Sequence, residues 1–155
     1  MSNDSTHGFG VARTKMEMPI GAPQQRVWQA LTQELEQWWP KSFCMNPNRV
    51  TSFRMEFKLG GRMYEDWGNG DGWLWWTIFK IDSQEMTFSA WGYESDASIH
   101  KMQFAVRADG NKSVLIVGDE AFGSLDAQQT SASHAAGWKE LFEGAFRPYV
   151  EKINR

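Results

Sequence analysis

The sequence predicts an α+β fold in which a curved antiparallel sheet of about six to seven strands wraps around one long C-terminal helix. Two observations predict it. The middle of the chain is a succession of alternating apolar and polar segments joined by short turns, and the C-terminal part has apolar residues at three-and-four spacing. Successive strands joined by short turns pair antiparallel, and an amphipathic helix must bury its apolar side on the sheet. Two short helices are expected after the first strand.

The N-terminal segment is expected to contain a tail, a strand and the two short helices. Residues 1–10 are mostly polar and are predicted to be a flexible tail, whereas Val11–Ile20 partly alternates as a half-buried strand does. Pro23 suits the first turn of a helix over Gln24–Thr32, which carries one apolar stripe. A second helix over Gln33–Trp39 is expected to end because a proline follows it.

The strands of the sheet are marked by alternation and by glycine-rich turns. The clearest strand is Val50–Leu59, which places four large apolar side chains on one face and polar side chains on the other. Gly68–Gly72 and Asp109–Asn111 are typical hairpin turns. The remaining strands are expected over Arg62–Trp67, Trp73–Ile81, Met86–Gly92, Ser98–Ala108 and Ser113–Phe122.

The chain is expected to end in a long helix over roughly Ser131–Ile153. Pro148 lies inside it, removes one backbone hydrogen bond and crowds the carbonyl of Gly144, so the spacing predicts a kink over Gly144–Pro148. The alternative is a helix that ends near Phe146. The residues that carry the helical spacing are His134, Trp138, Leu141, Phe142, Ala145, Tyr149 and Ile153.

Length and charge exclude several classes of protein. A chain of 155 residues predicts a single domain, here over residues 11–155. With 16 Lys+Arg against 19 Asp+Glu, the chain lacks the basic excess of a nucleic-acid binder. No stretch of about 18 apolar residues predicts a membrane span, and no apolar leader follows Met1, so a cytoplasmic protein is expected. The single Cys44 excludes an internal disulfide.

The chain is rich in aromatic residues, which make up 14% of it and include nine Trp. Such a small domain has either an oversized aromatic core or a lined cavity. Trp38 and Trp39 are expected either to pack in the core, where they would anchor the two short helices to the sheet, or to lie at the opening of the cavity. By the period of two, Trp73 and Trp75 should face one side of their strand and Trp76 the other. A Trp on the outer side would serve as the anchor of a homodimer contact.

Four motifs occur in an order that resembles a known superfamily. They are VWQALT at residues 27–32, WWP at 38–40, GGRMYE at 60–65 and HAAGW at 134–138. Together with the elements between them, they resemble the SRPBCC or START-like superfamily over about residues 11–152. Within it, the chain is similar to the group related to the C-terminal domain of the activator of heat-shock protein 90 ATPase.

The resemblance implies a helix-grip fold with a deep hydrophobic cavity between the sheet and the C-terminal helix. It does not imply one function, because similar domains bind lipids, hormones or polyketides, cyclise aromatic intermediates, or assist a chaperone. The first hypothesis is therefore the non-catalytic binding of a small hydrophobic, aromatic or planar molecule in a cavity of about 300–1,000 Å³. The residues expected to line it are Trp39, Phe57, Tyr64, Trp75, Trp91, Phe104, His134, Trp138 and Phe142.

Two other functions remain open. In a cyclase or aromatase acting on a polyketide-like substrate, His134, Tyr64 or Glu65 would move protons. In a chaperone-associated interaction domain, the outer sheet face with Trp73 or Trp76 would bind the partner. His134 also has a plainer interpretation, in which it caps the start of the last helix.

The sequence predicts neither a metal site nor a cofactor site. The three His residues have no metal-ligand spacing, and Cys44 has no neighbouring His. Glu65 and Asp66 are consecutive on a strand, so they point to opposite faces and cannot form an acid/base pair. We expect them on a solvated face. A buried carboxylate would need a partner such as Arg54, Arg62 or His100.

Overall fold

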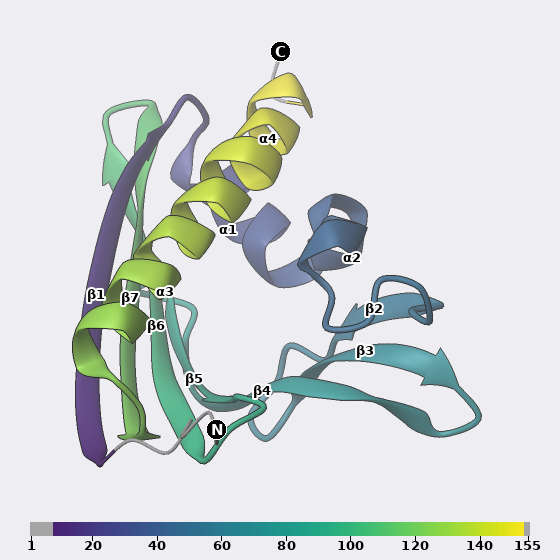
Figure 1. Cartoon of the computed structure of the whole chain (residues 1–155). Coiled ribbons are helices and arrows are strands. Elements are labelled where there is room, and N and C mark those ends of the chain that lie inside the picture. The colour runs from purple at the N-terminus through teal and green to yellow at the C-terminus, as the bar shows by residue number, and fades with distance from the viewer. Residues whose placement is uncertain (1–7, 154–155) are drawn as a thin grey trace.

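The computed structural model describes residues 8–153, and the elements follow the order predicted from the sequence (Figure 1). Strand β1 (Phe9–Ile20) is followed by helices α1 (Gln24–Gln33) and α2 (Leu35–Trp38) and by a short 3₁₀ turn (Lys41–Phe43). The next strands are β2 (Ser52–Met55), β3 (Arg62–Gly68), β4 (Asp71–Asp82), β5 (Thr87–Tyr93), β6 (Ser98–Asp109) and β7 (Lys112–Ser124). The last elements are α3 (Ala127–Leu141), a π-helical turn (Phe142–Phe146) and α4 (Arg147–Ile153).

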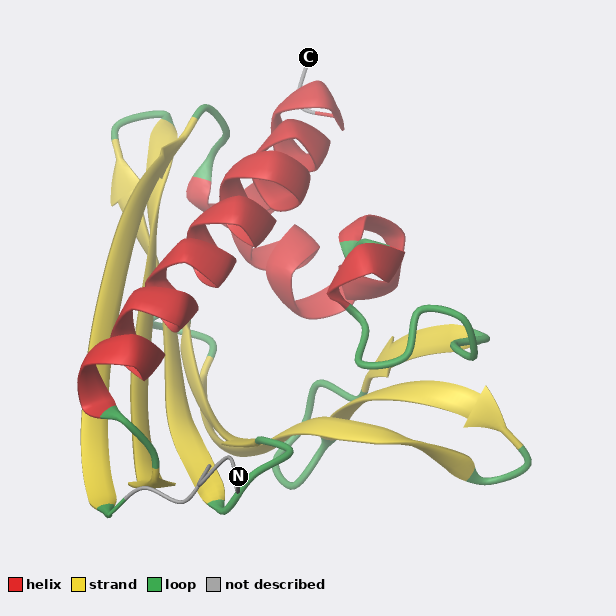
Figure 2. Ribbon diagram, viewed as in Figure 1, coloured by secondary structure: helices red, strands yellow, loops and turns green. Residues whose placement is uncertain are grey.

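The strands form one antiparallel sheet in the order β1-β7-β6-β5-β4-β3-β2. The sheet curves around the C-terminal helices, and β4, β3 and β2 extend away beneath α2 (Figure 2). Helix α3 packs on β1, α1 packs on β6 and β7, and α2 packs on β2. This is the α+β helix-grip fold predicted from the sequence. In the described residues, no helix is both long and apolar enough to span a membrane.

Two strands differ in length from the prediction. Residues 1–7 of the expected tail lie outside the described residues, but β1 already begins at Phe9, which pairs with Ser124. The second difference is that the strand predicted over Val50–Leu59 is reduced to the four residues of β2. The chain turns after it because the Gly61 N–H bonds to the Lys58 carbonyl. A Cβ at Gly61 would lie only 1.8 Å from a backbone oxygen, so only glycine fits this turn.

A β-bulge changes the orientation of the Trp residues in β4. Met63 pairs with Trp76 and Tyr64 pairs with Leu74, so Trp75 is the extra residue. The bulge brings Trp75 and Trp76 to the same inner side of the sheet, and Trp76 is buried with 1% of its surface exposed. The prediction that Trp76 faces away from Trp75 is therefore wrong, and Trp76 is too buried to bind a partner on the outer sheet face.

The C-terminal helix begins earlier than predicted and changes its pitch before Pro148. Asp126 accepts a hydrogen bond from the Gln129 N–H and caps α3, which explains the start at Ala127. Pro148 has no N–H to donate to Gly144, and the Arg147 N–H bonds to Phe142 five residues back. The expected disruption is thus a π-helical turn. The alternative end near Phe146 is wrong, because α4 continues to Ile153.

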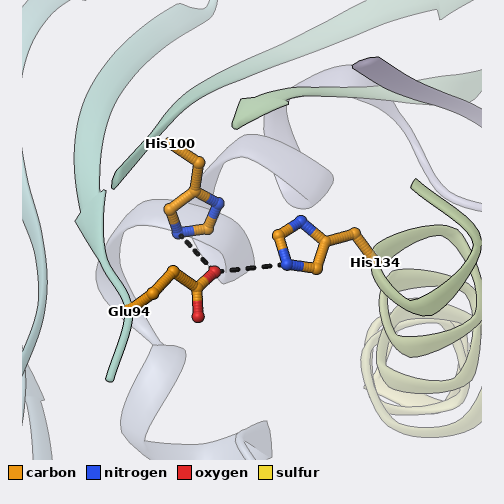
Figure 3. A group of neighbouring side chains, drawn as sticks. All are labelled: Glu94, His100 and His134. Atoms are coloured by element: carbon orange, nitrogen blue, oxygen red, sulfur yellow. Dashed lines mark ion pairs between the residues drawn. The ribbon is translucent and has the colours of Figure 1, made fainter. Parts of the chain in front are cut away.

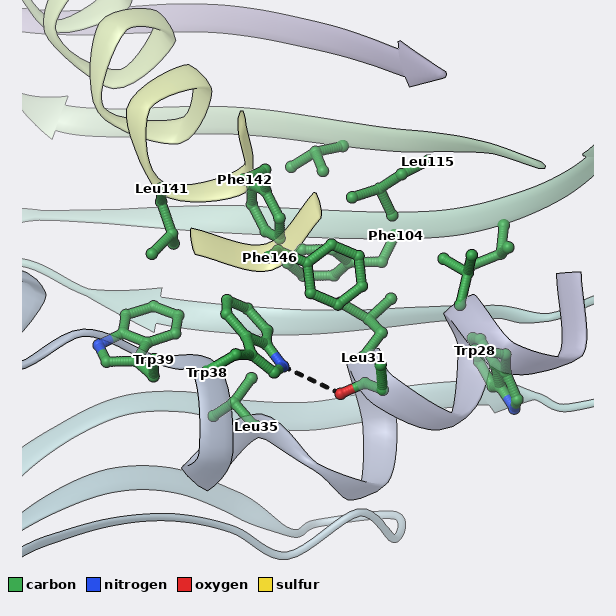
Figure 4. Close-up of a cluster of buried hydrophobic side chains, with 14 of the residues drawn as sticks. Trp28, Leu31, Leu35, Trp38, Trp39, Phe104, Leu115, Leu141, Phe142 and Phe146 are labelled. Atoms are coloured by element: carbon green, nitrogen blue, oxygen red, sulfur yellow. Dashed lines mark hydrogen bonds between the residues drawn. The ribbon is translucent and has the colours of Figure 1, made fainter. Parts of the chain in front are cut away.

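The space between sheet and helices is filled by a hydrophobic core rich in aromatic rings (Figure 4). Trp38 packs on Phe146 with ring centroids 4.7 Å apart, and its Nε1 donates to the Ala30 carbonyl. Trp39 stacks on Phe53 at 4.6 Å with an interplanar angle of 10°. Both Trp residues at the end of α2 are therefore part of the core. A smaller hollow remains where the core reaches α3.

Candidate functional site

A buried carboxylate lies where the sheet meets α3. Asp119 on β7 has 1% of its side chain exposed and accepts hydrogen bonds from three rings. His100 Nδ1 lies 3.0 Å from Oδ1, His134 Nδ1 lies 2.8 Å from Oδ2, and Trp138 Nε1 donates to Oδ2 at 2.7 Å. His134 and Trp138 are one helical turn apart on α3, so both reach the same carboxylate. His134 therefore does not cap the helix, which begins seven residues earlier at Ala127.

The sheet has space for His100 only because a glycine lies beside it. Gly92 on β5 pairs with His100 on β6. A Cβ at Gly92 would lie 2.0 Å from His100 Nε2, far inside any real contact. The missing side chain lets the imidazole lie against Gly92 while Nδ1 reaches Asp119.

Glu94 completes the group from the loop after β5. Its Oε1 lies 3.2 Å from His134 Nε2 and 3.8 Å from His100 Nε2, so both imidazoles point toward the same oxygen (Figure 3). The Glu94 side chain is 31% exposed and the His134 side chain 19%, whereas His100 is almost fully buried. The cluster therefore extends from the core to solvent.

The charges of the cluster stabilise one another. Burial alone would raise the pKa of Asp119, but hydrogen bonds from His100 and His134 outweigh it and hold that pKa well below its ordinary value. Hydrogen bonds to Asp119 and then to Glu94 raise the pKa of His134 to about 10. In the absence of another cation, His134 is thus an imidazolium between two carboxylates at neutral pH.

A pocket of about 170 Å³ opens beside this cluster. Its walls are mostly apolar, and its polar groups converge at one end, a combination typical of small-molecule sites. Three hollows of about 500 Å³ are larger. One lies on the outer sheet face among Arg13, Lys15 and Lys80, and another lies along the β3–β4 hairpin. The third, of about 540 Å³, lies where the loop between β5 and β6 meets Phe9 and Phe122. The pocket is lined by Phe43, Met45, Trp75, Tyr93, Glu94, His100, Ser133, His134, Gly137 and Trp138.

A second buried carboxylate supports the mouth of the pocket. Glu65 on β3 is fully buried and accepts hydrogen bonds from Trp75 Nε1 and Trp67 Nε1, each at 2.9 Å, and from the backbone N–H groups of Met45 and Asn46. Burial would raise the pKa of Glu65, but these donors lower it below its ordinary value. The expectation of a solvated face is therefore wrong for Glu65, and its partners are indole and backbone N–H groups.

Three of the nine residues predicted to line a cavity are brought together by the pocket, namely Trp75, His134 and Trp138. Four others are packed into the aromatic core instead. Phe57 contacts Trp28 and Phe88 edge-on. The other three belong to the buried core, namely Trp39, Phe104 and Phe142.

Tyr64 and Trp91 lie on the outer face of the sheet. Tyr64 is next to the buried Glu65 and contacts the Arg62 guanidinium at 5.2 Å. Trp91 stacks on Phe79 with ring centroids 5.4 Å apart. Adjacent strand residues point to opposite faces. Because the strand neighbours of Tyr64 and Trp91 point inward, these two side chains point away from the space under α3.

Sequence reasoning missed Glu94 and Asp119 and did not assign His100 to the site. For Asp119 a signal exists, because the residue occupies an inward position of β7, where Leu115 and Val117 are buried. A carboxylate in such a register needs partners. Glu94 gives no such signal, since it lies in a loop and is brought to the two His residues only by the fold.

Comparisons with known proteins agree with this architecture. No curated protein matches the chain in sequence. A solved structure of an uncharacterized protein from Rhizobium leguminosarum has a TM-score of 0.70 at 16% identity, over 94% of this chain and 97% of that one. Ara h 8.0201 has a TM-score of 0.67 at 15% identity, over 91% and 98%. Norcoclaurine synthase of Thalictrum flavum, as a point mutant in complex with a transition-state analogue, has a TM-score of 0.64 at 9% identity, over 96% and 99%.

These structural likenesses show the fold, whereas the family is shown by the sequence. Residues 21–151 match the profile described as Activator of Hsp90 ATPase homolog 1-like protein. This range includes all four motifs, from residues 27–32 to residues 134–138. The chain therefore belongs to the family of activator of Hsp90 ATPase homolog 1-like proteins, within the SRPBCC or START-like superfamily.

Proposed function

We propose that the protein binds a small molecule with one planar ring and a hydroxyl group in the pocket beside α3. The observation that carries the proposal is the pocket itself, with apolar walls and a polar end made by His134 and Glu94. The ring would lie among side chains of Phe43, Met45, Trp75 and Trp138. Flat aromatic walls favour a planar ligand because rings stack or meet edge to face.

The volume of the pocket limits the ligand to about one ring. A cavity of about 150 Å³ in another protein accepts benzene, and this pocket measures about 170 Å³. It is smaller than the volume expected from the sequence, because the aromatic core fills most of the space under the helix. This size favours a single ring over a multi-ring, polyketide-like substrate, and so favours binding over cyclisation.

The polar end selects a group that both donates and accepts a hydrogen bond. Glu94 offers carboxylate oxygens and His134 offers a ring N–H in the same corner of the pocket. A phenolic hydroxyl satisfies both. A ring that loses about 100 Å² of apolar surface gains about 2.5 kcal/mol before ordering costs. A hydrogen bond to a charged group adds about 1.5 kcal/mol or more. The sum of about 4 kcal/mol corresponds to binding in the millimolar range.

Phenol and toluene test the proposal, because they share a ring and differ in the hydroxyl group. Titration of the chelator-treated protein should change the fluorescence of Trp75 and Trp138 and raise the melting temperature. Phenol should bind about tenfold more tightly than toluene, because only phenol can form a hydrogen bond with the Glu94 carboxylate at the polar end of the pocket.

Gly137 allows the pocket to be closed without disturbing the core. It lines the pocket, and a Cβ there meets nothing within 4 Å. Gly137→Leu should abolish phenol binding while leaving the helix intact, since leucine favours helix more than glycine does. Gly144→Leu is the matched control, because Gly144 also meets nothing within 4 Å but lies away from the pocket. If neither ring binds, or if Gly137→Leu binds phenol as well as the parent protein, the proposal is wrong.

A further inference from the structure

Three potential metal ligands converge from three separate elements. Glu94 comes from the loop after β5, His100 from β6 and His134 from α3, and one ligand atom of each lies within 4.8 Å of the others. Ligands at about 2.0–2.2 Å from Zn²⁺ in a tetrahedral site lie about 3.3–3.6 Å from each other. Glu94 Oε1 lies 3.2 Å from His134 Nε2 and 3.8 Å from His100 Nε2, just below and just above that range. Glu94 and His134 are partly exposed, so these two side chains would adjust to a cation around the buried His100.

Asp119 orients both imidazoles in the way that a metal site requires. Metal-bound His residues usually donate their second ring N–H to a carboxylate or carbonyl, which fixes the tautomer and the direction of the free lone pair. Here one buried carboxylate lies against both Nδ1 atoms, at 3.0 Å for His100 and 2.8 Å for His134. Trp138 Nε1 fixes the carboxylate in turn. Both Nε2 atoms therefore point toward Glu94.

The site is open on one side. Glu94, His100 and His134 line the 170 Å³ pocket, and Glu94 and His134 also line a hollow of about 290 Å³ that includes Asp96 and Ser98. A cation held by three protein ligands would keep a position free for water or another small ligand, as in catalytic rather than structural zinc sites.

The chemistry of the three ligands selects the kind of cation. Two imidazoles and one carboxylate suit Zn²⁺, Fe²⁺ or Co²⁺, whereas Mg²⁺ and Ca²⁺ prefer oxygen alone. The two carboxylates, Asp119 and Glu94, balance the charge of one divalent cation when both imidazoles are neutral. We infer that Glu94, His100 and His134 form a binding site for one divalent transition-metal ion, with Asp119 as the group that positions both His ligands.

The inference does not depend on the pocket's organic ligand, and it is tested with the metal alone. Titration of the full-length, chelator-treated protein with Zn²⁺ in a calorimeter should give one saturable site per chain. Glu94→Gln removes the carboxylate charge at a partly exposed position and keeps the shape of the side chain. It should weaken Zn²⁺ binding at least about tenfold. His134→Ala should do the same, with circular dichroism confirming the fold of each variant.

Control variants separate this site from other sources of Zn²⁺ binding. Glu85→Gln makes the same change at an exposed position in the turn between β4 and β5, at the other end of β5 from Glu94. His7→Ala and Cys44→Ser remove the third His, which lies outside the described residues, and the only thiol. All three should bind Zn²⁺ as the parent protein does, within about twofold.

Co²⁺ adds a readout of the ligand set that binding alone does not give. A three-ligand site with one open position should produce strong visible absorption, since Co²⁺ with four or five ligands absorbs far more than the hydrated ion. Glu94→Gln should lose this absorption, and Glu85→Gln should keep it. The inference is overturned if the parent protein shows no saturable site, if Glu94→Gln binds Zn²⁺ unchanged, or if Cys44→Ser or His7→Ala removes binding.

Discussion

Trp138 Nε1 donates a hydrogen bond of 2.7 Å to Asp119 Oδ2 and thereby connects the long C-terminal helix to strand β7 inside the core. Both residues are buried. The Trp138 indole contributes more to stability than the burial of its apolar area alone. Without its N–H, the buried Asp119 carboxylate would lose one of its hydrogen-bond donors.

Replacing this indole by phenylalanine should separate its polar contribution from its packing. Trp138→Phe keeps a ring in place but removes the donor, so we expect a loss of about 2 to 4 kcal/mol in the free energy of unfolding. Urea denaturation measures it. Trp76→Phe is the matched control, because Trp76 is buried and its Nε1 has no hydrogen-bond partner among the described residues. If both variants lose the same amount, the bond to Asp119 contributes nothing measurable.

Gly92→Ala should destabilise the protein and displace His100. The added methyl group would lie 2.0 Å from His100 Nε2, and the buried imidazole cannot move without losing Asp119. We expect a loss of about 1 to 3 kcal/mol and a shifted His100 signal in the NMR spectrum. Gly118→Ala is the control, because its Cβ would make only ordinary contacts from 3.6 Å outward. An unchanged His100 resonance in Gly92→Ala would contradict this account of the glycine.

The order of the elements was predictable because local patterns determine it. Alternation marks most of the strands, and the three-and-four spacing marks the last helix up to its proline. The bulge at Trp75 was not predictable, because it depends on how β3 pairs with β4 and a period of two contains no information about an extra residue. Of the residues predicted to line a cavity, two face outward, namely Tyr64 and Trp91. Four pack in or against the core, namely Trp39, Phe57, Phe104 and Phe142.

The candidate site was predictable only where it lies on one element. His134 and Trp138 share a helix face, so their spacing alone groups them. Asp119 and His100 depend on the register between β7 and β6, and Glu94 depends on the path of a loop. These residues are far apart in the sequence and meet because the sheet curves under α3. No local sequence pattern specifies that curvature.

Cys44 should react slowly with thiol reagents in the folded protein. Burial, followed by the nearby charge of Glu65, raises the pKa of the Cys44 thiol to about 11. The thiolate is the reactive form, so at pH 8 we expect a rate roughly 100-fold below that of the unfolded chain. Modification with an aromatic disulfide reagent, with and without urea, measures the ratio. The chain has one Cys, so no other thiol contributes. Equal rates in both conditions would show that the thiol is not buried and that its pKa is not raised.

The ion pair between Arg26 and Glu34 should make stability depend on pH in the acid range. Arg26 Nη1 and Nη2 each lie 2.8 Å from one Glu34 oxygen, and Tyr149 of α4 donates to the same carboxylate. The hydrogen bond from Arg26 is the largest cause that lowers the pKa of Glu34 to about 2. Because the folded-state pKa is depressed, the stabilisation is complete above the unfolded value of about 4.5 and is lost as the pH falls toward 2.

Glu34→Gln tests this directly, because it removes the charge and keeps the shape. At pH 7 the variant should be less stable than the parent by about 1 to 3 kcal/mol in urea denaturation, and the difference should shrink between about pH 4.5 and pH 2.5. Glu120→Gln is the control, because the Arg13–Glu120 pair is exposed and such pairs contribute about 0 to 1 kcal/mol. A difference for Glu34→Gln that stays constant over this pH range would mean that the pair does not lower the pKa of Glu34. The connection from α1 to α4 would then rest on the Tyr149 hydroxyl and apolar packing.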